Sequence, residues 1–220
     1  MPRGSEKLTN SRKEEIINAC ALLYETMSFK EITLKEIGEK TSFTRTSIYN
    51  YFQTKEEIFL ALFQREYEAW IRDLKIMLEE KEKMSVAGFA GALAHTLEKR
   101  GRLLKLLSMN HYDMEANSRM ENLVAFKTAY GNSLSTLSCC LEKFFPEMTD
   151  RDIQGFIYAF FPFLFGVYPY TVVTEKQKAA MEAADVNYVC LSVYEIVESV
   201  VKKLLGEKKD EDHYLTGKSE

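Results

Sequence analysis

The chain is poor in the residues that build long loops and enzyme sites. Its 220 residues include four Pro, ten Gly, one Trp and three His. So few Pro and Gly leave little room for loops, and this length can bury a substantial core in one large or two small domains. The sequence contains no Walker loop, no G-x-S-x-G, no H-E-x-x-H and no dinucleotide-binding glycine motif. We therefore expect neither an enzyme nor a bound cofactor.

Cysteine and histidine are too few and too poorly spaced to indicate a metal site. No C-x-x-C pair occurs among the cysteines, which are Cys20, Cys139, Cys140 and Cys190. We interpret them as small buried side chains in a reducing cytosol, with a redox switch at the adjacent pair as the alternative. His111, Asp113 and Glu115 are side chains that a divalent ion accepts. Their spacing is unspecific, so a solvated polar loop is favoured and the metal alternative stays open.

Neither positive nor negative charge is in large excess, but the two are unevenly distributed along the chain. The formal net charge is −4, with 46% hydrophobic and 28% charged residues, which is ordinary for a globular protein. Residues 1–55 hold nine Lys and Arg against seven Asp and Glu, whereas the rest of the chain is acidic. A mildly basic head on an acidic body fits a small nucleic-acid contact surface. The first ten residues contain no apolar run, so we expect no signal peptide and a cytoplasmic protein.

Residues 155–173 form a run without charge that is long enough to raise the question of a membrane span. The run contains Pro162 and Pro169, has no positively charged flank, and is not accompanied by a second span. A helix that is apolar all round also suits a protein in which one face packs on the core and another on a partner. We expect a buried helix bent at its prolines, and no membrane.

Apolar residues recur at helical spacing along most of the chain, and no segment alternates as a strand would. The fold class is therefore predicted to be all-α. Residues 1–10 are expected to form a disordered arm. The predicted helices span residues 11 to about 27, 54–81, 84–100, 103 to about 110, 117–145, 149–173, and a last one from 174 or 185 to about 205.

The stretch 32–55 predicts two short helices joined by a tight turn. Thr33 and Glu36 form a capping box, so the first helix begins there. Thr44 is placed to cap the second helix, in which Ile48 turns inward. The side chains left on the solvent side, where a recognition helix touches base edges, are Arg45, Thr46, Tyr49 and Asn50.

Residues 33–55 resemble the DNA-binding motif of the TetR-type one-component bacterial repressors. The family pattern runs from a helix-opening Thr to Tyr-x-x-Phe-x-x-Lys, which Tyr49, Phe52 and Lys55 match at the right spacing. Three positions depart from the pattern, namely Gly38, Ser42 and Thr46. Since Gly is usual in the turn, its replacement by Ser leads us to expect a positive φ there.

The resemblance implies a three-helix helix-turn-helix head (1–53), a helical effector-binding and dimerisation body (54–205) and a polar tail (206–220). It implies a homodimer that binds a pseudo-palindromic double-stranded operator and is released by a small-molecule effector. Arg45 and Asn50 are predicted to read bases. The contacts predicted mostly to hold phosphates are Thr33, Thr44, Ser47, Tyr49, Tyr51 and Lys55. The full predicted contact set is Thr33, Thr44, Arg45, Thr46, Ser47, Tyr49, Asn50, Tyr51 and Lys55.

Aromatic and other apolar side chains of the body come from different helices at points expected to converge. Such a wall, apolar with a few hydroxyls, is typical of a small-molecule pocket and predicts a fairly apolar effector. For the histidine on the 84–100 helix, a satisfied core position is the alternative. The predicted pocket residues are Trp70, Phe89, Leu93, His95, Leu107, Tyr112, Phe126, Tyr130 and Phe163.

The last two predicted helices, about 149–173 and 185–205, carry more apolar surface than one body can hide. Paired with their symmetry mates they would form a four-helix bundle, and in the resembling family these two helices make the dimer. The residues predicted at this interface are Phe156, Phe160, Val186, Val193, Val197 and Val200.

Two other functions remain open from the sequence. One is a helical enzyme or a carrier of lipids or small molecules that keeps a vestigial head. The exposed Arg45 and Asn50 argue against it, because a purely structural helix gains nothing from that surface. The other is a DNA-binding module without an effector, which would require a body that lacks a cavity.

Overall fold

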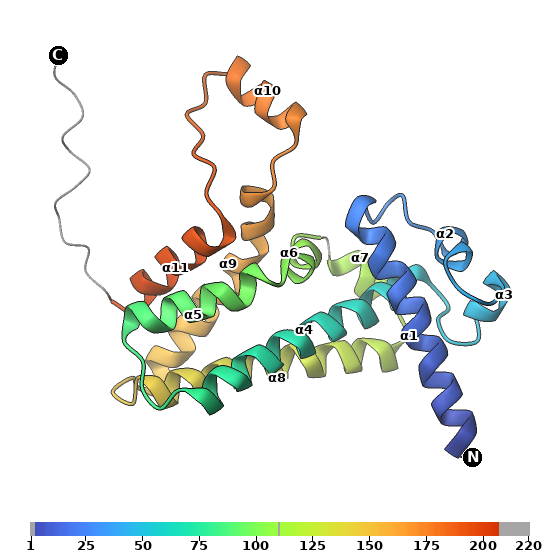
Figure 1. The fold of residues 1–220 in the computed structure, drawn as a ribbon, viewed down its shortest axis with the longest axis horizontal. Coiled ribbons are helices and arrows are strands. Elements are labelled where there is room, and N and C mark those ends of the chain that lie inside the picture. The colour runs from blue at the N-terminus through green and yellow to red at the C-terminus, as the bar shows by residue number, and fades with distance from the viewer. Residues whose placement is uncertain (1–2, 110, 207–220) are drawn as a thin grey trace.

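The computed structural model describes residues 3–109 and 111–206, and every regular element within them is an α-helix (Figure 1). The predicted fold class is therefore confirmed. The helices are α1 (Arg3–Thr26), α2 (Leu34–Glu39), α3 (Arg45–Ile48), α4 (Lys55–Glu80), α5 (Val86–Glu98), α6 (Gly101–Leu107), α7 (His111–Ala116), α8 (Met120–Phe144), α9 (Asp150–Thr171), α10 (Glu175–Ala183) and α11 (Val193–Leu204).

The head lies at one end of the molecule, where α1, α2 and α3 gather around the first turns of α4 (Figure 1). α4 has 26 residues, and at ~1.5 Å per residue it extends far beyond the head. In the body α4 packs along α8, α5 packs against α11, and α6 packs against α9. One continuous apolar core runs from Ile16 and Ile48 in the head to Leu137 and Val201 in the body.

Capping boxes set several helix starts. In each, a Thr or Ser side chain accepts from a backbone N–H in the first turn, and an acidic or amide side chain three residues on accepts in return. The boxes open α2, α9, α10 and α11, at Thr33, Thr149, Thr174 and Ser192. The long α4 likewise begins where predicted, because the Thr54 side chain accepts from the Glu57 N–H.

The first helix is longer than predicted. α1 begins at Arg3 rather than at Ser11, so the expectation of a disordered arm is wrong for residues 3–10. Glu6, Lys7 and Leu8 are good helix formers, and no Pro interrupts the segment after Arg3. The Ser11-x-x-Glu14 pattern therefore lies inside a helix that had already begun. Residues 1 and 2 lie outside the described residues.

Two later segments also differ from the prediction. Residues His111–Ala116, expected as an unravelled polar loop, form the helix α7. The predicted last helix is two helices, α10 and α11, with a non-helical connection over residues 184–192. Asp185 takes a left-handed φ of 51° where α10 ends. The predicted tail lies outside the described residues except for Gly206.

α9 continues through Pro162 and Pro169 and buries one face in the core. Within residues 3–109 and 111–206 no single helix is long and apolar enough to cross a membrane, and α9 and α10 meet that requirement only jointly, across a bend of 85°. α10 projects away from the body (Figure 1), and none of its residues is buried.

Candidate DNA-binding surface and effector groove

A carboxylate of α1 holds the turn between α2 and α3. Glu15 accepts from the backbone N–H of Ser42 and, at 3.1 Å, from its hydroxyl. These bonds lower the pKa of Glu15. Among the described residues, Asp185 is the one non-glycine residue with a positive φ. The positive φ expected at Ser42 is therefore wrong. Glu15 satisfies the turn N–H, and Ser42 keeps an ordinary backbone.

α2 and α3 approach one another closely at Gly38. A Cβ placed on Gly38 would lie 3.2 Å from Cβ and 3.3 Å from Cα of Arg45. Glycine therefore lets the first residue of α3 sit against α2 without displacement. This contact gives a structural reason for a Gly where the TetR-type pattern usually has Ala.

α3 presents a polar face to solvent. Ile48 is fully buried, which turns the opposite side of the helix outward. Tyr49, at 47% exposure, and Asn50 lie just beyond the last residue of α3 rather than within it. Thr44 precedes α3 in an extended conformation, with its hydroxyl 3.1 Å from that of Ser47. The four side chains predicted to face solvent, Arg45, Thr46, Tyr49 and Asn50, are exposed.

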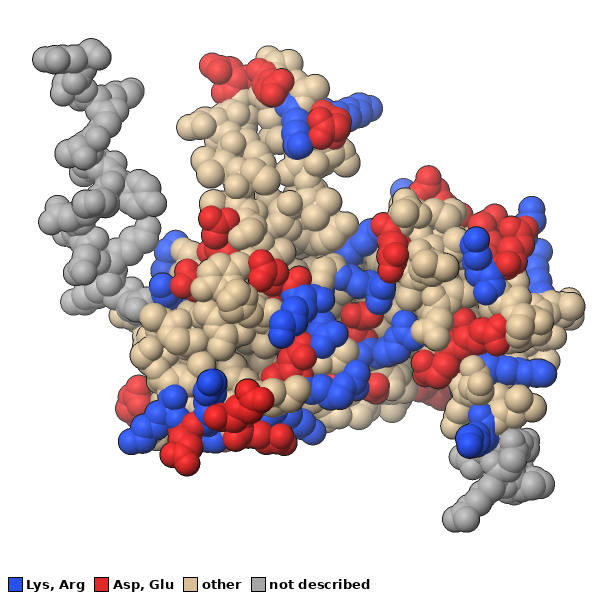
Figure 2. Space-filling model, viewed as in Figure 1, with Lys and Arg blue, Asp and Glu red and all other residues tan. Residues whose placement is uncertain are grey.

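Two predicted phosphate contacts already have partners within the head. Lys55 donates to the carbonyl oxygens of Phe29 and Ile32, at 2.8 and 3.0 Å. The Tyr51 hydroxyl accepts from Arg12 at 3.4 Å. Lys55 thus holds the connection between α1 and α2, and its contact with DNA stays a prediction. Over the head, basic and acidic side chains lie interspersed on the face shown in Figure 2, so that face has no broad field of one sign.

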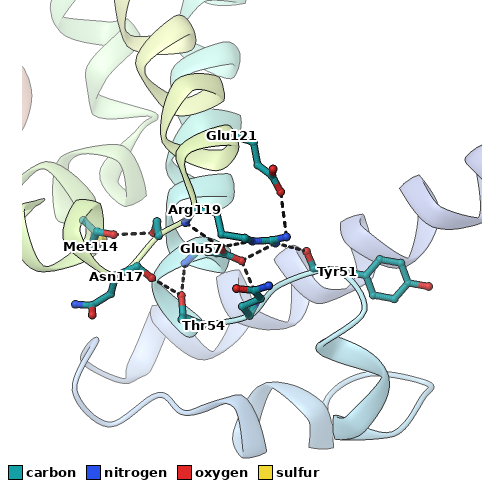
Figure 3. A network of polar contacts seen from close by, with 9 residues as sticks. Tyr51, Thr54, Glu57, Met114, Asn117, Arg119 and Glu121 are labelled. Atoms are coloured by element: carbon teal, nitrogen blue, oxygen red, sulfur yellow. Dashed lines mark hydrogen bonds and ion pairs between the residues drawn. The ribbon is translucent and has the colours of Figure 1, made fainter.

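A buried carboxylate joins the start of α4 to the body (Figure 3). Glu57 is fully buried and accepts from Nε, Nη2 and the backbone N–H of Arg119, at 2.6, 2.8 and 3.0 Å. The backbone N–H of Gln53 donates to it at 2.8 Å. Burial alone would raise the pKa of Glu57, but these donors hold it at about 2. Sequence reasoning missed this pair, because 62 residues separate its members.

A second joint connects α6 to the C-terminal end of α1. Arg102 pairs with Glu25 of α1 and Glu66 of α4, each at 2.9 Å. The Tyr24 hydroxyl donates to the carbonyl oxygen of Lys105 at 3.3 Å, and the Lys105 ammonium donates to the Tyr24 carbonyl. Burial lowers the pKa of Lys105. The body therefore holds the head at two places that are distant in sequence.

An apolar groove of about 630 Å³ lies between α8 and α9. Most of its wall comes from aromatic rings, and no charged side chain is among the described residues that line it. The lining residues are Tyr130, Leu134, Ile157, Tyr158, Phe161, Pro162 and Phe165. Trp70 lies one ring behind this wall, 5.8 Å from the Phe161 ring, and its indole N–H donates to Thr96 at 2.9 Å.

The groove contains one of the nine predicted pocket residues, Tyr130. His95 lies at the surface, with its side chain 61% exposed and Nδ1 3.1 Å from Glu98, so it takes neither position considered for it. Tyr112 is 84% exposed, and Phe163 is half-buried against Phe160. The other five are packed in the core, namely Trp70, Phe89, Leu93, Leu107 and Phe126. Helical periodicity identified inward faces but not the place where packing leaves space.

Among the described residues, no cluster of metal ligands forms around His111, so the structure gives the metal alternative no support. The His111 ring lies between the rings of Phe63 and Phe165, at 5.2 and 5.0 Å. Burial lowers its pKa. Glu115 pairs with Lys127. Across the described part of the chain, no three His, Cys, Asp or Glu side chains gather as metal ligands would.

The cysteines divide into two kinds. Cys20 and Cys140 are buried as predicted, and burial raises the pKa of each thiol to about 12. Cys139 and Cys190 are exposed, so the buried position predicted for them is wrong. A thiol with so high a pKa is a poor nucleophile, which weakens the redox alternative at the adjacent pair.

The predicted interface residues do not share one outer face. Phe156, Phe160 and Val197 are buried within the protomer and pack in its own core. Val186 is exposed on the connection after α10, and the remaining two, Val193 and Val200, are half-buried on α11. The outer face of α9 instead carries small, uncharged residues four and three apart, namely Gly155, Ala159, Pro162, Gly166 and Pro169.

These features define a class of protein. A helix-turn-helix head exposes a short polar helix, and a long helix connects it to a helical body with an apolar groove, as in the two-domain helical regulators that bind DNA. The family model described as "Bacterial regulatory proteins, tetR family" matches residues 16–62. The model described as "Tetracyclin repressor-like, C-terminal domain" matches residues 64–205. The chain belongs to the TetR family of transcriptional regulators, which are not enzymes.

A sequence relative and solved structures resemble this chain. An uncharacterized HTH-type transcriptional regulator of Bacillus subtilis, YfiR, is 26% identical over 73 residues, 33% of this chain and 36% of that protein. The match thus spans about a third of that relative. The fatty acid degradation regulator FadR of Bacillus halodurans superposes with a TM-score of 0.58 at 18% identity, covering 90% of this chain and 96% of its own.

A second structure shares the fold and contains a ligand. The FadR repressor of Thermus thermophilus, in complex with lauroyl-CoA, superposes with a TM-score of 0.56 at 18% identity. The superposition covers 94% of this chain and all of that one. At this identity the likeness establishes the fold.

Proposed function

We propose that this regulator is a repressor that binds a pseudo-palindromic operator as a dimer and releases it when a small apolar effector binds. The observation that carries the DNA-binding part is the exposed polar face of α3. Burial of Ile48 leaves Arg45 and Asn50 outward. Arg can donate two bonds to guanine, and Asn can pair with adenine in the major groove.

A substitution in α3 tests this docking. A duplex is first selected from random sequence with the wild-type protein, and binding of Arg45→Ala is then measured by fluorescence anisotropy. Loss of a bidentate base contact should cost ~1–3 kcal/mol and relax selectivity at one position of each half-site. Lys178→Ala removes an exposed cation of α10, remote from the head, and should bind as the wild type does. Unchanged affinity and selectivity in Arg45→Ala would refute this docking.

The proposed effector carries an apolar chain, such as an acyl group. The α8–α9 groove of about 630 Å³ supports this choice, because its described lining is apolar or aromatic and uncharged. Apolar burial contributes about 0.8 kcal/mol per methylene, so a long chain can bind there without a charged partner. The lauroyl-CoA held by the Thermus thermophilus protein is a ligand of this chemistry.

The proposed dimer uses the outer face of α9. Side chains as small as those of Gly155, Ala159 and Gly166 let two helices approach closely. Together with Pro162 and Pro169 they recur four and three residues apart, a spacing that matches that of helices packed side by side. A two-fold axis would place the same face of both protomers in contact.

A further inference from the structure

The connection between α3 and α4 is held from the body at two adjacent points (Figure 3). Arg119, between α7 and α8, donates from Nη2 to the carbonyl oxygen of Tyr51 at 3.2 Å, while the same guanidinium binds Glu57. Two residues earlier, the carbonyl oxygen of Asn117 accepts from the Thr54 hydroxyl at 3.0 Å. The corner between α7 and α8 thus contacts the chain on both sides of the residue that opens α4.

Several short hydrogen bonds hold this contact together. Glu57 is fully buried, and its two carboxylate oxygens accept four bonds, three from Arg119 and one from Gln53. Loss of Arg119 would leave the buried Glu57 carboxylate without its charged partner, which is strongly destabilising. The corner and the α3–α4 connection should therefore move as a unit.

The far end of α7 reaches the apolar groove. The His111 ring, at the start of α7, contacts Phe165 of the groove wall and Phe63 of α4. Met114, in the middle of α7, is fully buried. A shift of the Phe165 ring would therefore act on α7 at one end, and α7 ends at the corner that holds the recognition helix.

We propose that Arg119 is a positioning residue for the recognition helix, and that α7 links its position to the groove at Phe165. The inference rests on the proposed role of α3 in reading DNA. The other joint, at Arg102, holds α1 and not the α3–α4 connection. The two joints should therefore have different effects on α3.

The first test is amide hydrogen exchange, followed by mass spectrometry, in Arg119→Gln. We expect exchange in peptides that cover residues 45–57 to rise about tenfold or more, while peptides of α5, α9 and α11 stay at the wild-type rate. Glu121→Gln removes the exposed partner of Arg119 and should leave residues 45–57 unchanged. Arg102→Gln should raise exchange at the end of α1 instead. Wild-type exchange of residues 45–57 in Arg119→Gln, or an equal rise throughout the chain, would overturn the proposal.

If Arg119→Gln does not fold, the pair Glu57→Gln with Arg119→Gln leaves no unpaired buried charge and takes its place. The link through α7 is tested with His111→Ala. This substitution should raise exchange of residues 45–57 in the presence of Arg119 and add nothing in the Arg119→Gln background. Additive effects would show that α7 and Arg119 act independently, contrary to the proposal.

A separate measurement distinguishes this inference from the proposed function. Arg119→Gln should bind the selected duplex at least tenfold more weakly than the wild type, and unchanged affinity would contradict a positioning role. Failure of the wild type to select any duplex would instead refute the proposed operator binding, while the exchange results would still test the joint.

Discussion

Glu57 and Trp70 are buried polar side chains whose partners are distant in sequence. Glu57 is held by Arg119, and the Trp70 indole by Thr96. Such groups make few contacts with solvent that could replace a lost partner, so their substitution is costly. Exposed pairs such as Lys35–Glu39, with side chains 68% and 64% exposed, contribute little by comparison.

The first prediction concerns acid stability. The Glu57 pKa is about 2 in the folded protein against an ordinary 4.5. Its stabilisation is therefore fully present above pH ~4.5 and is lost as the pH falls towards 2. The shift corresponds to roughly 3 kcal/mol. Urea denaturation at several pH values should show a decline in the free energy of unfolding over this range that is weaker in Glu57→Gln. Glu121→Gln, at an exposed position, serves as the control and should follow the wild type.

The second prediction concerns the indole of Trp70. Thr96→Val keeps the shape of the side chain but leaves the buried Trp70 N–H without its acceptor. We expect the free energy of unfolding to fall by ~1–3 kcal/mol. Thr128→Val removes a hydroxyl that donates to a helix carbonyl, as the Thr96 hydroxyl donates to Leu93, but at an exposed position. It should change stability by less than about 0.5 kcal/mol. Equal effects of the two substitutions in chemical denaturation would contradict the assignment.

At the scale of helices, local sequence signals predicted where a helix begins better than they predicted where its side chains lie in the fold. The capping boxes at Thr33 and Thr149 set the observed starts of α2 and α9. The box Ser192-x-x-Glu195 was equally readable and would have separated α11 from α10. His95 fell outside the core because it lies two residues from both Leu93 and Leu97, about 200° around the helix. A sequence pattern cannot locate the Glu57–Arg119 pair, which depends on how α4 and α8 pack.

The third prediction concerns the outer face of α9. Ala159 is exposed in the protomer, so Ala159→Arg should fold normally while placing a charge in the proposed interface. Light scattering should then report a monomer at concentrations where the wild type is a dimer, because an unpaired buried charge is strongly unfavourable. Ser135→Arg makes the same change at an exposed position of α8 and should remain dimeric. A monomeric wild type at micromolar concentration would exclude this dimer.

At the scale of the molecule, α4 and α8 form a frame that runs from the head to the groove. α1 packs directly on α4, the Glu57–Arg119 contact lies at the head end of this frame, and the groove lies between α8 and α9. An effector can change DNA affinity only by binding the two positions of the head unequally. Allosteric coupling energies of ~1–3 kcal/mol are typical.

The fourth prediction concerns the effector. Lauroyl-CoA should quench or shift Trp70 fluorescence, because that indole lies one ring behind the groove wall, and should weaken duplex binding roughly 5- to 150-fold at saturation. Leu134→Arg places a cation in the groove and should weaken the fluorescence response without changing duplex affinity in the absence of ligand. Ser135→Arg, one residue away, should respond as the wild type does. A fluorescence response that persists in Leu134→Arg would locate the ligand elsewhere.

The two joints have a geometric consequence for control of the head. An object held at two points turns most easily about the line that joins them, and the packing of α1 on α4 resists that turn. The joint at Arg102 and Lys105 and the joint at Asn117 and Arg119 define such an axis. In a symmetric pair of protomers, the separation of the two α3 helices would then depend mainly on the angle about this line. A small rotation at the axis would be enlarged at α3 in proportion to its distance from that line.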